Sequence, residues 1–89
     1  MPTISMFYGI IIYMYFFDNK KHHRPHIHAF HGEFEAIIAI DNGEVLSGEL
    51  PINKMKLVAA WIEIHQEELL ADWSLALEGV QLFIIEPLK

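Results

Sequence analysis

The 89-residue sequence contains no cysteine. This absence excludes a disulfide framework, a cysteine nucleophile and every zinc site that depends on thiolates. Any metal ion bound by the chain must therefore be held by histidine and carboxylate side chains.

Positive charge is also scarce, because six Lys and Arg residues stand against twelve Asp and Glu residues, for a formal net charge of −6. A nucleic-acid-binding protein needs a basic face that neutralises several phosphates. Only Lys20, Lys21 and Arg24 lie close together in the sequence. We therefore expect no direct contact with nucleic acid.

Long apolar segments are missing as well. The run Ile10–Phe17 is far shorter than the roughly 20 residues that span a bilayer, and no basic segment precedes it as in a secretory signal. We expect no membrane contact and a cytoplasmic location. The sequence shows no recognisable nucleophile arrangement or phosphate-binding loop either, so a binding protein is expected more than an enzyme.

Apolar residues, in contrast, are abundant. They make up 53% of the chain, above the 45–50% usual for globular proteins, and 89 residues suffice for one domain with one core, spanning 1–89. The surplus apolar surface predicts contact with a second copy of the chain or with a small protein partner. The residues expected at this partner interface are Leu57, Ala60, Trp61 and Ile64.

Apolar runs separated by turn residues predict four or five short strands. Gly9 interrupts the segment 4–17, which indicates one bent strand or two short ones. Gly32-Glu33 fits a two-residue hairpin turn, and Asn42-Gly43 is a strong hairpin signal. The remaining predicted strands are 26–31, 34–40, Val45–Leu50 and Val80–Ile85.

Helical periodicity covers 54–78, with Asn53 as the predicted N-cap and Gly79 as the stop. One unbroken helix would be about 38 Å long and would overhang its sheet, so we expect either a break between His65 and Asp72 or packing of the free part of the helix on another chain. The expected fold is α+β and two-layered, a mostly antiparallel sheet of four to five strands packed against one long or two shorter helices. The stripe expected to face the core is Val58, Ile62, His65, Leu69, Trp73 and Ala76.

Five of the six histidines lie within residues 22–31. His26 and His28 stand two residues apart in a predicted strand, so their side chains share a face and can chelate one divalent ion such as zinc or nickel. A third ligand is required for a site with an open position. The candidates are Glu35 and, on the loop before Pro25, His22.

The hairpin turn at Gly32-Glu33 sets the register around this pair. It places His28 opposite Ile37 and Phe30 opposite Glu35, so that Glu35 is the diagonal neighbour of His28, about 7 Å away at Cα. His31, opposite Phe34, falls on the face predicted to be the core.

Other interpretations of the cluster stay open. The histidines can form a solvated or partner-contacting surface, or, with Lys20, Lys21 and Arg24, a basic loop that attracts phosphate or carboxylate. They can also act as a metal-free acid/base pair. If a metal is present, a metal-dependent hydrolase is a further possibility, with Glu33 as the candidate general base.

The pattern resembles the short bacterial proteins of domain-of-unknown-function family 4160. In that family an Asp-His pair and two prolines usually lead into His-x-His; here Asp18 is displaced, His22 takes the histidine position and Arg24 replaces the first proline. The matching residues are Met1-Pro2-Thr3-Ile4-Ser5, Phe7, Gly9, Pro25-His26-Ile27-His28-Ala29, Gly32-Glu33, Gly48, Leu50-Pro51, Leu57-Val58, Trp61, His65, Glu68-Leu69, Trp73 and Pro87-Leu88.

The resemblance implies no established activity. It implies a protein encoded beside another very small protein, as a regulator or as one component of a toxin–antitoxin-like pair. Together with the surplus apolar surface, this favours a small intracellular interaction module. The alternative hypothesis is a metal-binding protein or metal-dependent hydrolase built on the histidine cluster.

Overall fold

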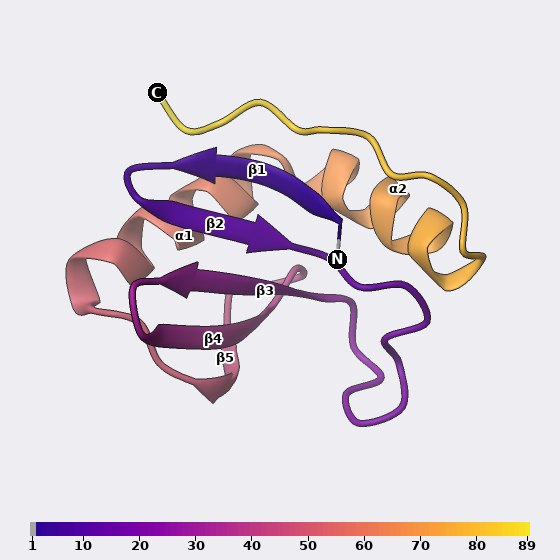
Figure 1. Cartoon of the computed structure of the whole chain (residues 1–89), viewed down its shortest axis with the longest axis horizontal. Coiled ribbons are helices and arrows are strands. Elements are labelled where there is room, and N and C mark those ends of the chain that lie inside the picture. Colours follow the sequence, from indigo (N-terminus) through magenta and orange to yellow (C-terminus); the bar gives the residue numbers. More distant parts are fainter. Residues whose placement is uncertain (1) are drawn as a thin grey trace.

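The computed structural model describes residues 2–89, so Met1 of the matched N-terminal motif lies outside the described residues. Five antiparallel strands form one sheet, and two helices pack behind it (Figure 1). The predicted α+β fold is confirmed. Its elements are β1 (Thr3–Phe7), β2 (Ile10–Tyr13), β3 (His26–His31), β4 (Phe34–Ala39), β5 (Val45–Gly48), α1 (Ile52–Ile64) and α2 (Gln66–Leu77).

The strands follow one another in chain order across the sheet, each antiparallel to the next. Gly9, at φ +78°, and Tyr8, at φ +50°, form the tight turn that divides the first apolar segment into β1 and β2. Such left-handed conformations at both central residues suit a two-residue hairpin. The register predicted for the β3–β4 hairpin is also confirmed, because His28 pairs with Ile37 and Phe30 with Glu35.

The core lies between one face of the sheet and the two helices. Alternate strand residues are buried there, as the period of two requires, and the predicted helical stripe faces them. On the opposite face Ile11, Tyr13 and Ile37 remain partly exposed. The fully buried core side chains include Ile10, Ile12, Ile27, Ala29, Ile38, Val58, Trp61, Leu69 and Ala76.

The helical segment breaks at His65, at the start of the predicted interval, where the backbone leaves helical geometry with φ −110° and ψ 26°. The prediction of Asn53 as N-cap is wrong. The helix begins earlier because the carbonyl of Pro51 accepts hydrogen bonds from the N–H groups of Lys54 and Met55, each at 2.9 Å. Neither helix, over the residues described, is long and apolar enough to cross a membrane.

The predicted strand Val80–Ile85 does not join the sheet. This segment runs beside β1 and α2 in Figure 1, but its only backbone hydrogen bond to β1 joins the Ile85 N–H to the Ile4 carbonyl, at 2.8 Å. The N–H of Phe83 donates instead to the side chain of Asp72, at 3.0 Å. A ladder therefore cannot form along this edge.

The last strand is shorter than predicted, because β5 ends at Gly48 and not at Leu50. Gly48 has φ +73° and lies so close to β4 that a Cβ atom would collide with the carbonyl oxygen of Glu35. That oxygen accepts the N–H of Glu49 at 2.9 Å. Glycine is required here for both its conformation and its small size.

Candidate metal centre

Strand β3 holds both histidines of the His-x-His motif on the face of the sheet that is turned away from Ile27 and Ala29. Pairing with β4 fixes His28 opposite Ile37 and His26 opposite Ala39, and β2 fixes Tyr13 opposite His28. The two side chains are nonetheless buried, at 1% exposure for His26 and 7% for His28. The sheet thus provides a rigid base for two enclosed imidazoles.

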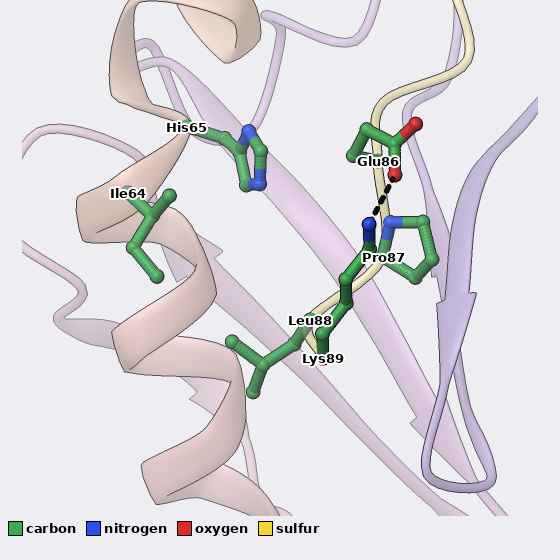
Figure 2. Close-up of a pocket in the computed structure, with 6 residues that line it drawn as sticks. All are labelled: Ile64, His65, Glu86, Pro87, Leu88 and Lys89. Atoms are coloured by element: carbon green, nitrogen blue, oxygen red, sulfur yellow. Dashed lines mark ion pairs between the residues drawn. The ribbon is translucent and has the colours of Figure 1, made fainter.

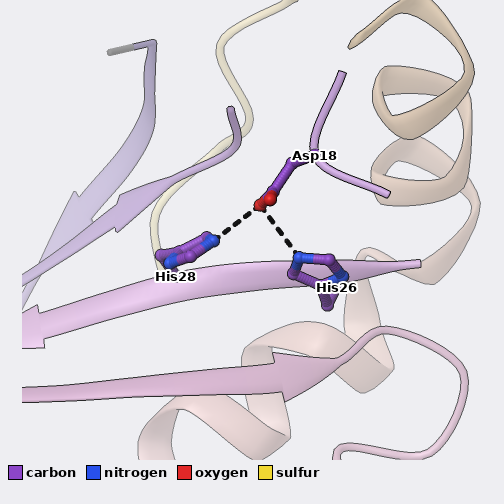
Figure 3. Close-up of side chains that lie close together, drawn as sticks. All are labelled: Asp18, His26 and His28. Atoms are coloured by element: carbon purple, nitrogen blue, oxygen red, sulfur yellow. Dashed lines mark hydrogen bonds and ion pairs between the residues drawn. The ribbon is translucent and has the colours of Figure 1, made fainter. Parts of the chain in front are cut away.

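The loop between β2 and β3 brings a carboxylate onto this pair. Asp18 Oδ2 lies 2.7 Å from His28 Nε2 and 2.9 Å from His26 Nε2, and Figure 3 shows the three side chains converging. The chain turns toward β3 just before Asp18, where Phe17 adopts φ +57° and its N–H donates to the Ala76 carbonyl at 3.0 Å. Helix α2 therefore helps to position the carboxylate.

The outward nitrogen of each imidazole has its own acceptor. His26 Nδ1 lies 2.7 Å from the carbonyl oxygen of Arg24, and His28 Nδ1 lies 3.2 Å from Glu35 Oε2. A carbonyl or carboxylate oxygen can only accept, so these two contacts are satisfied when both Nδ1 atoms carry hydrogen. In the neutral imidazoles the lone pairs then lie on the two Nε2 atoms, which face Asp18.

This arrangement requires positive charge between the three groups. Two Nε2 lone pairs beside a carboxylate oxygen repel one another unless protons or a cation lie between them. Imidazoles whose Nδ1–H groups are held by carbonyl or carboxylate acceptors, as here, are the usual arrangement of histidine metal ligands. The three ligand atoms of Asp18, His26 and His28 all lie within 4.8 Å of one another, a group that could hold a metal ion.

The distances show what metal binding would change. Tetrahedral ligands at about 2.1 Å from a zinc ion are about 3.4 Å apart, so the distances from the Asp18 oxygen to the two Nε2 atoms must lengthen by about 0.5 to 0.7 Å. Asp18 lies on a loop and its side chain is 29% exposed, whereas the histidines are fixed in a strand. The loop is therefore the part that adjusts.

The charge state of Asp18 suits this role. Burial alone would raise the pKa of its carboxyl, but hydrogen bonds from His28 and His26 and their positive charge lower that pKa overall. Asp18 is thus a carboxylate, the form that ligates metals, at neutral pH. Nearby, burial and the negative charge of Glu35 raise the pKa of Tyr15, so its hydroxyl keeps its proton.

Aromatic rings enclose the pair. The ring of Tyr15 lies 4.3 Å from that of His28, and Trp73 lies 4.9 Å from His26, measured between ring centroids. These walls exclude water from two sides and strengthen electrostatic interactions between the groups inside. Asp18 is the most exposed of the three groups.

The structure brings together only part of the predicted ligand set. His26 and His28 converge as expected, but Glu35 lies at the Nδ1 of His28, where it orients the imidazole. His22 packs with its ring edge toward His26, 5.7 Å between centroids, and its buried Nε2 has no hydrogen-bond partner among residues 2–89. The third converging group, Asp18, was missed as a ligand, although the Asp-His pair of the resembling family pointed to that loop.

His31 and His65 form hydrogen bonds outside this group. His31 Nδ1 bonds the carbonyl of Gly9 at 3.1 Å, and His65 Nδ1 bonds Glu68 at 2.7 Å. The basic loop is partly neutralised, because Arg24 pairs with Asp41 at 2.8 Å and with Glu44 at 2.5 Å. This pairing weakens the interpretation of the cluster as an anion-binding loop.

The predicted partner patch is only partly exposed. Trp61 cannot belong to it, because its side chain is fully buried and its indole N–H donates to the Glu86 carbonyl at 2.8 Å. Leu57 is partly buried, whereas Ala60 and Ile64 are exposed. Ile64 borders a depression of about 350 Å³ between the end of α1 and the terminal residues, toward which His65 points (Figure 2). This depression contains none of the converging metal-site residues.

Comparison with known proteins gives one family. A family model described as "Domain of unknown function (DUF4160)" matches residues 9–74, well over half of the chain and including Asp18, His26 and His28. The resemblance noted from the sequence is thereby confirmed. Neither a curated protein nor a solved structure matches the chain.

Proposed function

We propose that this chain, which belongs to the DUF4160 family, binds one divalent transition-metal ion such as zinc or nickel through Asp18, His26 and His28. The observation that carries the proposal is the convergence of two Nε2 atoms and one carboxylate oxygen while both Nδ1 atoms are occupied by acceptors. Nitrogen and carboxylate ligands in this combination suit such ions.

His22 is the proposed fourth ligand. Its Nε2 atom is buried without a hydrogen-bond partner in the described part of the chain, and its ring touches that of His26. A buried nitrogen without a partner is costly, and an ion would satisfy it. A ligand set of three histidines and one aspartate would close the site and fix the loop 18–25 to the sheet.

A closed site favours binding over hydrolysis. Catalytic zinc keeps an open position for water and needs a base beside it. The Glu35 carboxylate is already hydrogen-bonded to His28, and Glu33 lies exposed at the tip of the hairpin, so neither is placed as that base. We therefore place a metal-stabilised binding protein ahead of a metal-dependent hydrolase.

The test is elemental analysis of protein purified without an affinity tag, followed by zinc and nickel titration. Wild-type protein should hold about one equivalent of metal, and His26→Ala and His28→Ala should each lose it while circular dichroism shows a retained fold. His23→Ala, which changes an exposed histidine of the same cluster, is the matched control and should keep the metal. Equal metal content in wild type and in the His26 and His28 variants would reject the site.

A second proposed function is that of an interaction module in a two-protein pair, as the partner or regulatory, antitoxin-like component. The support is large exposed apolar side chains, with Ile52 at 77%, Ile64 at 65%, Phe83 at 72% and Ile84 at 76% exposure. Surface of this kind usually meets a partner. Light scattering tests self-association, and a monodisperse monomer that binds no co-expressed small partner would contradict this proposal.

We propose further that the chain makes no direct DNA contact. The net charge is −6, and Arg24 of the basic cluster is already paired. Titration against duplex DNA at physiological salt should show no submicromolar binding. Submicromolar affinity would show this charge argument to be wrong.

A further inference from the structure

The segment from Leu57 to Leu88 carries charge of one sign only. From Leu57 to Leu88 there are six acidic residues and no Lys or Arg. These residues form most of α1, all of α2 and the extended C-terminal segment. A surface made from them attracts cations and repels anions, including a second copy of itself.

The C-terminal segment is extended but largely unpaired. Within residues 2–89, the backbone N–H groups of Gln81, Leu82 and Ile84 have no hydrogen-bond partner, while Phe83 and Ile85 are held by Asp72 and Ile4. The side chains of Phe83 and Ile84 are 72% and 76% exposed. An extended backbone with free donors and apolar side chains is a surface to which another extended chain can add.

A cavity of about 230 Å³ lies between this segment and α2. Its wall includes Asp72, which is only 1% exposed; one oxygen accepts the Phe83 N–H, but Oδ2 has no partner among the residues described. Burial, with a contribution from the negative charge of Glu68, raises the pKa of this carboxyl. The residues lining the cavity are Glu68, Ala71, Asp72, Phe83, Ile84 and Ile85.

These features call for a donor that residues 2–89 do not supply. An unpaired buried carboxylate oxygen is costly to leave, and it is best satisfied by a charged donor. The cavity is too narrow for a folded domain but has room for one long side chain, and its rim of Phe83 and Ile84 suits the methylene stem of Arg or Lys.

We propose that the groove formed by Glu68, Asp72, Phe83 and Ile84 binds an extended segment of a partner protein in which Arg or Lys alternates with apolar residues. One basic side chain enters the cavity and pairs with Asp72, its apolar neighbours cover Phe83 and Ile84, and its backbone bonds the free amides of the C-terminal segment. The same segment of a second copy is disfavoured as occupant, because residues Leu57 to Leu88 include no Lys or Arg. This inference does not depend on the metal site.

The experiment uses the full chain, labelled with ¹⁵N, and two capped octapeptides as probes. One alternates arginine with valine, and the other alternates glutamate with valine. The arginine peptide should shift the amide resonances of residues 80–85 and of α2 around Asp72, with saturation, and the glutamate peptide should not. Its affinity should fall at least tenfold between 50 mM and 500 mM salt, because the pairing is electrostatic.

Two variants locate the interaction. Asp72→Asn retains a carbonyl oxygen for the Phe83 N–H but removes the charge, and should weaken binding of the arginine peptide about tenfold. Phe83→Ser combined with Ile84→Ser changes only exposed side chains, so it should fold normally and weaken binding similarly. Asp41→Asn, an exposed acidic residue elsewhere, is the control and should bind like wild type.

Three results would overturn the proposal. They are equal shifts with both peptides, shifts centred outside α2 and residues 80–85, and unchanged affinity in both groove variants. Concentration-dependent shifts at the groove without peptide would instead identify a second copy as the occupant and overturn the choice of partner. None of these results bears on metal content, so the metal proposal is judged separately.

Discussion

Glu35 accepts the Nδ1–H of His28 across the β3–β4 hairpin, with 3.2 Å between Nδ1 and Oε2. The register predicted from the sequence places this carboxylate close to His28. In the structure it lies at Nδ1, whereas Asp18 lies at Nε2 of the same ring. A carboxylate at Nδ1 fixes the tautomer and raises the basicity of the Nε2 that faces the site. We therefore propose that Glu35 positions His28 and is not itself a ligand.

Replacing Glu35 with alanine should weaken zinc binding by about 10- to 100-fold while leaving one equivalent bound at saturation. Competition with a chromophoric chelator measures this affinity. Glu33→Ala, at the tip of the same hairpin, is the matched control and should have wild-type affinity. An unchanged affinity in Glu35→Ala would show that the hydrogen bond does not orient His28, and complete loss of binding would restore Glu35 as a ligand.

Asp72→Asn should stabilise the protein at neutral pH. Burial raises the pKa of Asp72 above its ordinary value of 3.8. The folded state therefore holds the proton more tightly than the unfolded state, and stability falls as pH rises from below about 4 through the folded pKa. Urea unfolding should give a higher midpoint for the variant than for wild type at pH 7.

The same comparison at pH 3 supplies the control. Both proteins then carry a neutral side chain at position 72, and their midpoints should coincide. A variant less stable than wild type at pH 7 but equally stable at pH 3 would mean that the carboxylate is well paired in the folded protein, contrary to the structure.

Gly48→Ala should destabilise the fold strongly. The new Cβ would meet the Glu35 carbonyl oxygen and would force a left-handed conformation on alanine, so we expect a loss of about 3 kcal/mol or more in the free energy of unfolding. Gly32→Ala is the matched comparison, because Gly32 also has positive φ but open space around it. It should cost about 1 kcal/mol. Equal losses in the two variants would contradict the packing argument at Gly48.

Much of the sheet could be predicted from local patterns. The turn glycines and the period of two set the β3–β4 register, and with it the shared face of His26 and His28. The C-terminal segment could not be predicted in this way, since its apolar residues suit a strand. Whether it pairs depends on Asp72, a residue of another element that takes the N–H of Phe83.

The candidate site could likewise be predicted only in part. The shared face of His26 and His28 follows from their spacing in one strand. Asp18 reaches them from a loop that is held by the hydrogen bond between Phe17 and Ala76 of α2. Helical periodicity predicted that Trp61 belongs to a surface patch. In the structure Trp61 packs in the core against Phe7, with 5.2 Å between the ring centroids. Tertiary contacts of this kind leave no local pattern in the sequence.

We infer that Asp18, which the spacing of the histidines did not identify, completes the proposed metal site with His26 and His28. Isothermal titration calorimetry with zinc, on wild type and Asp18→Ala, tests this most directly, with Glu63→Ala as the control for removing an exposed acidic side chain. The account predicts one zinc ion per chain for wild type and the control, and an affinity at least 100-fold weaker for Asp18→Ala. Equal zinc affinity in wild type and Asp18→Ala would contradict it.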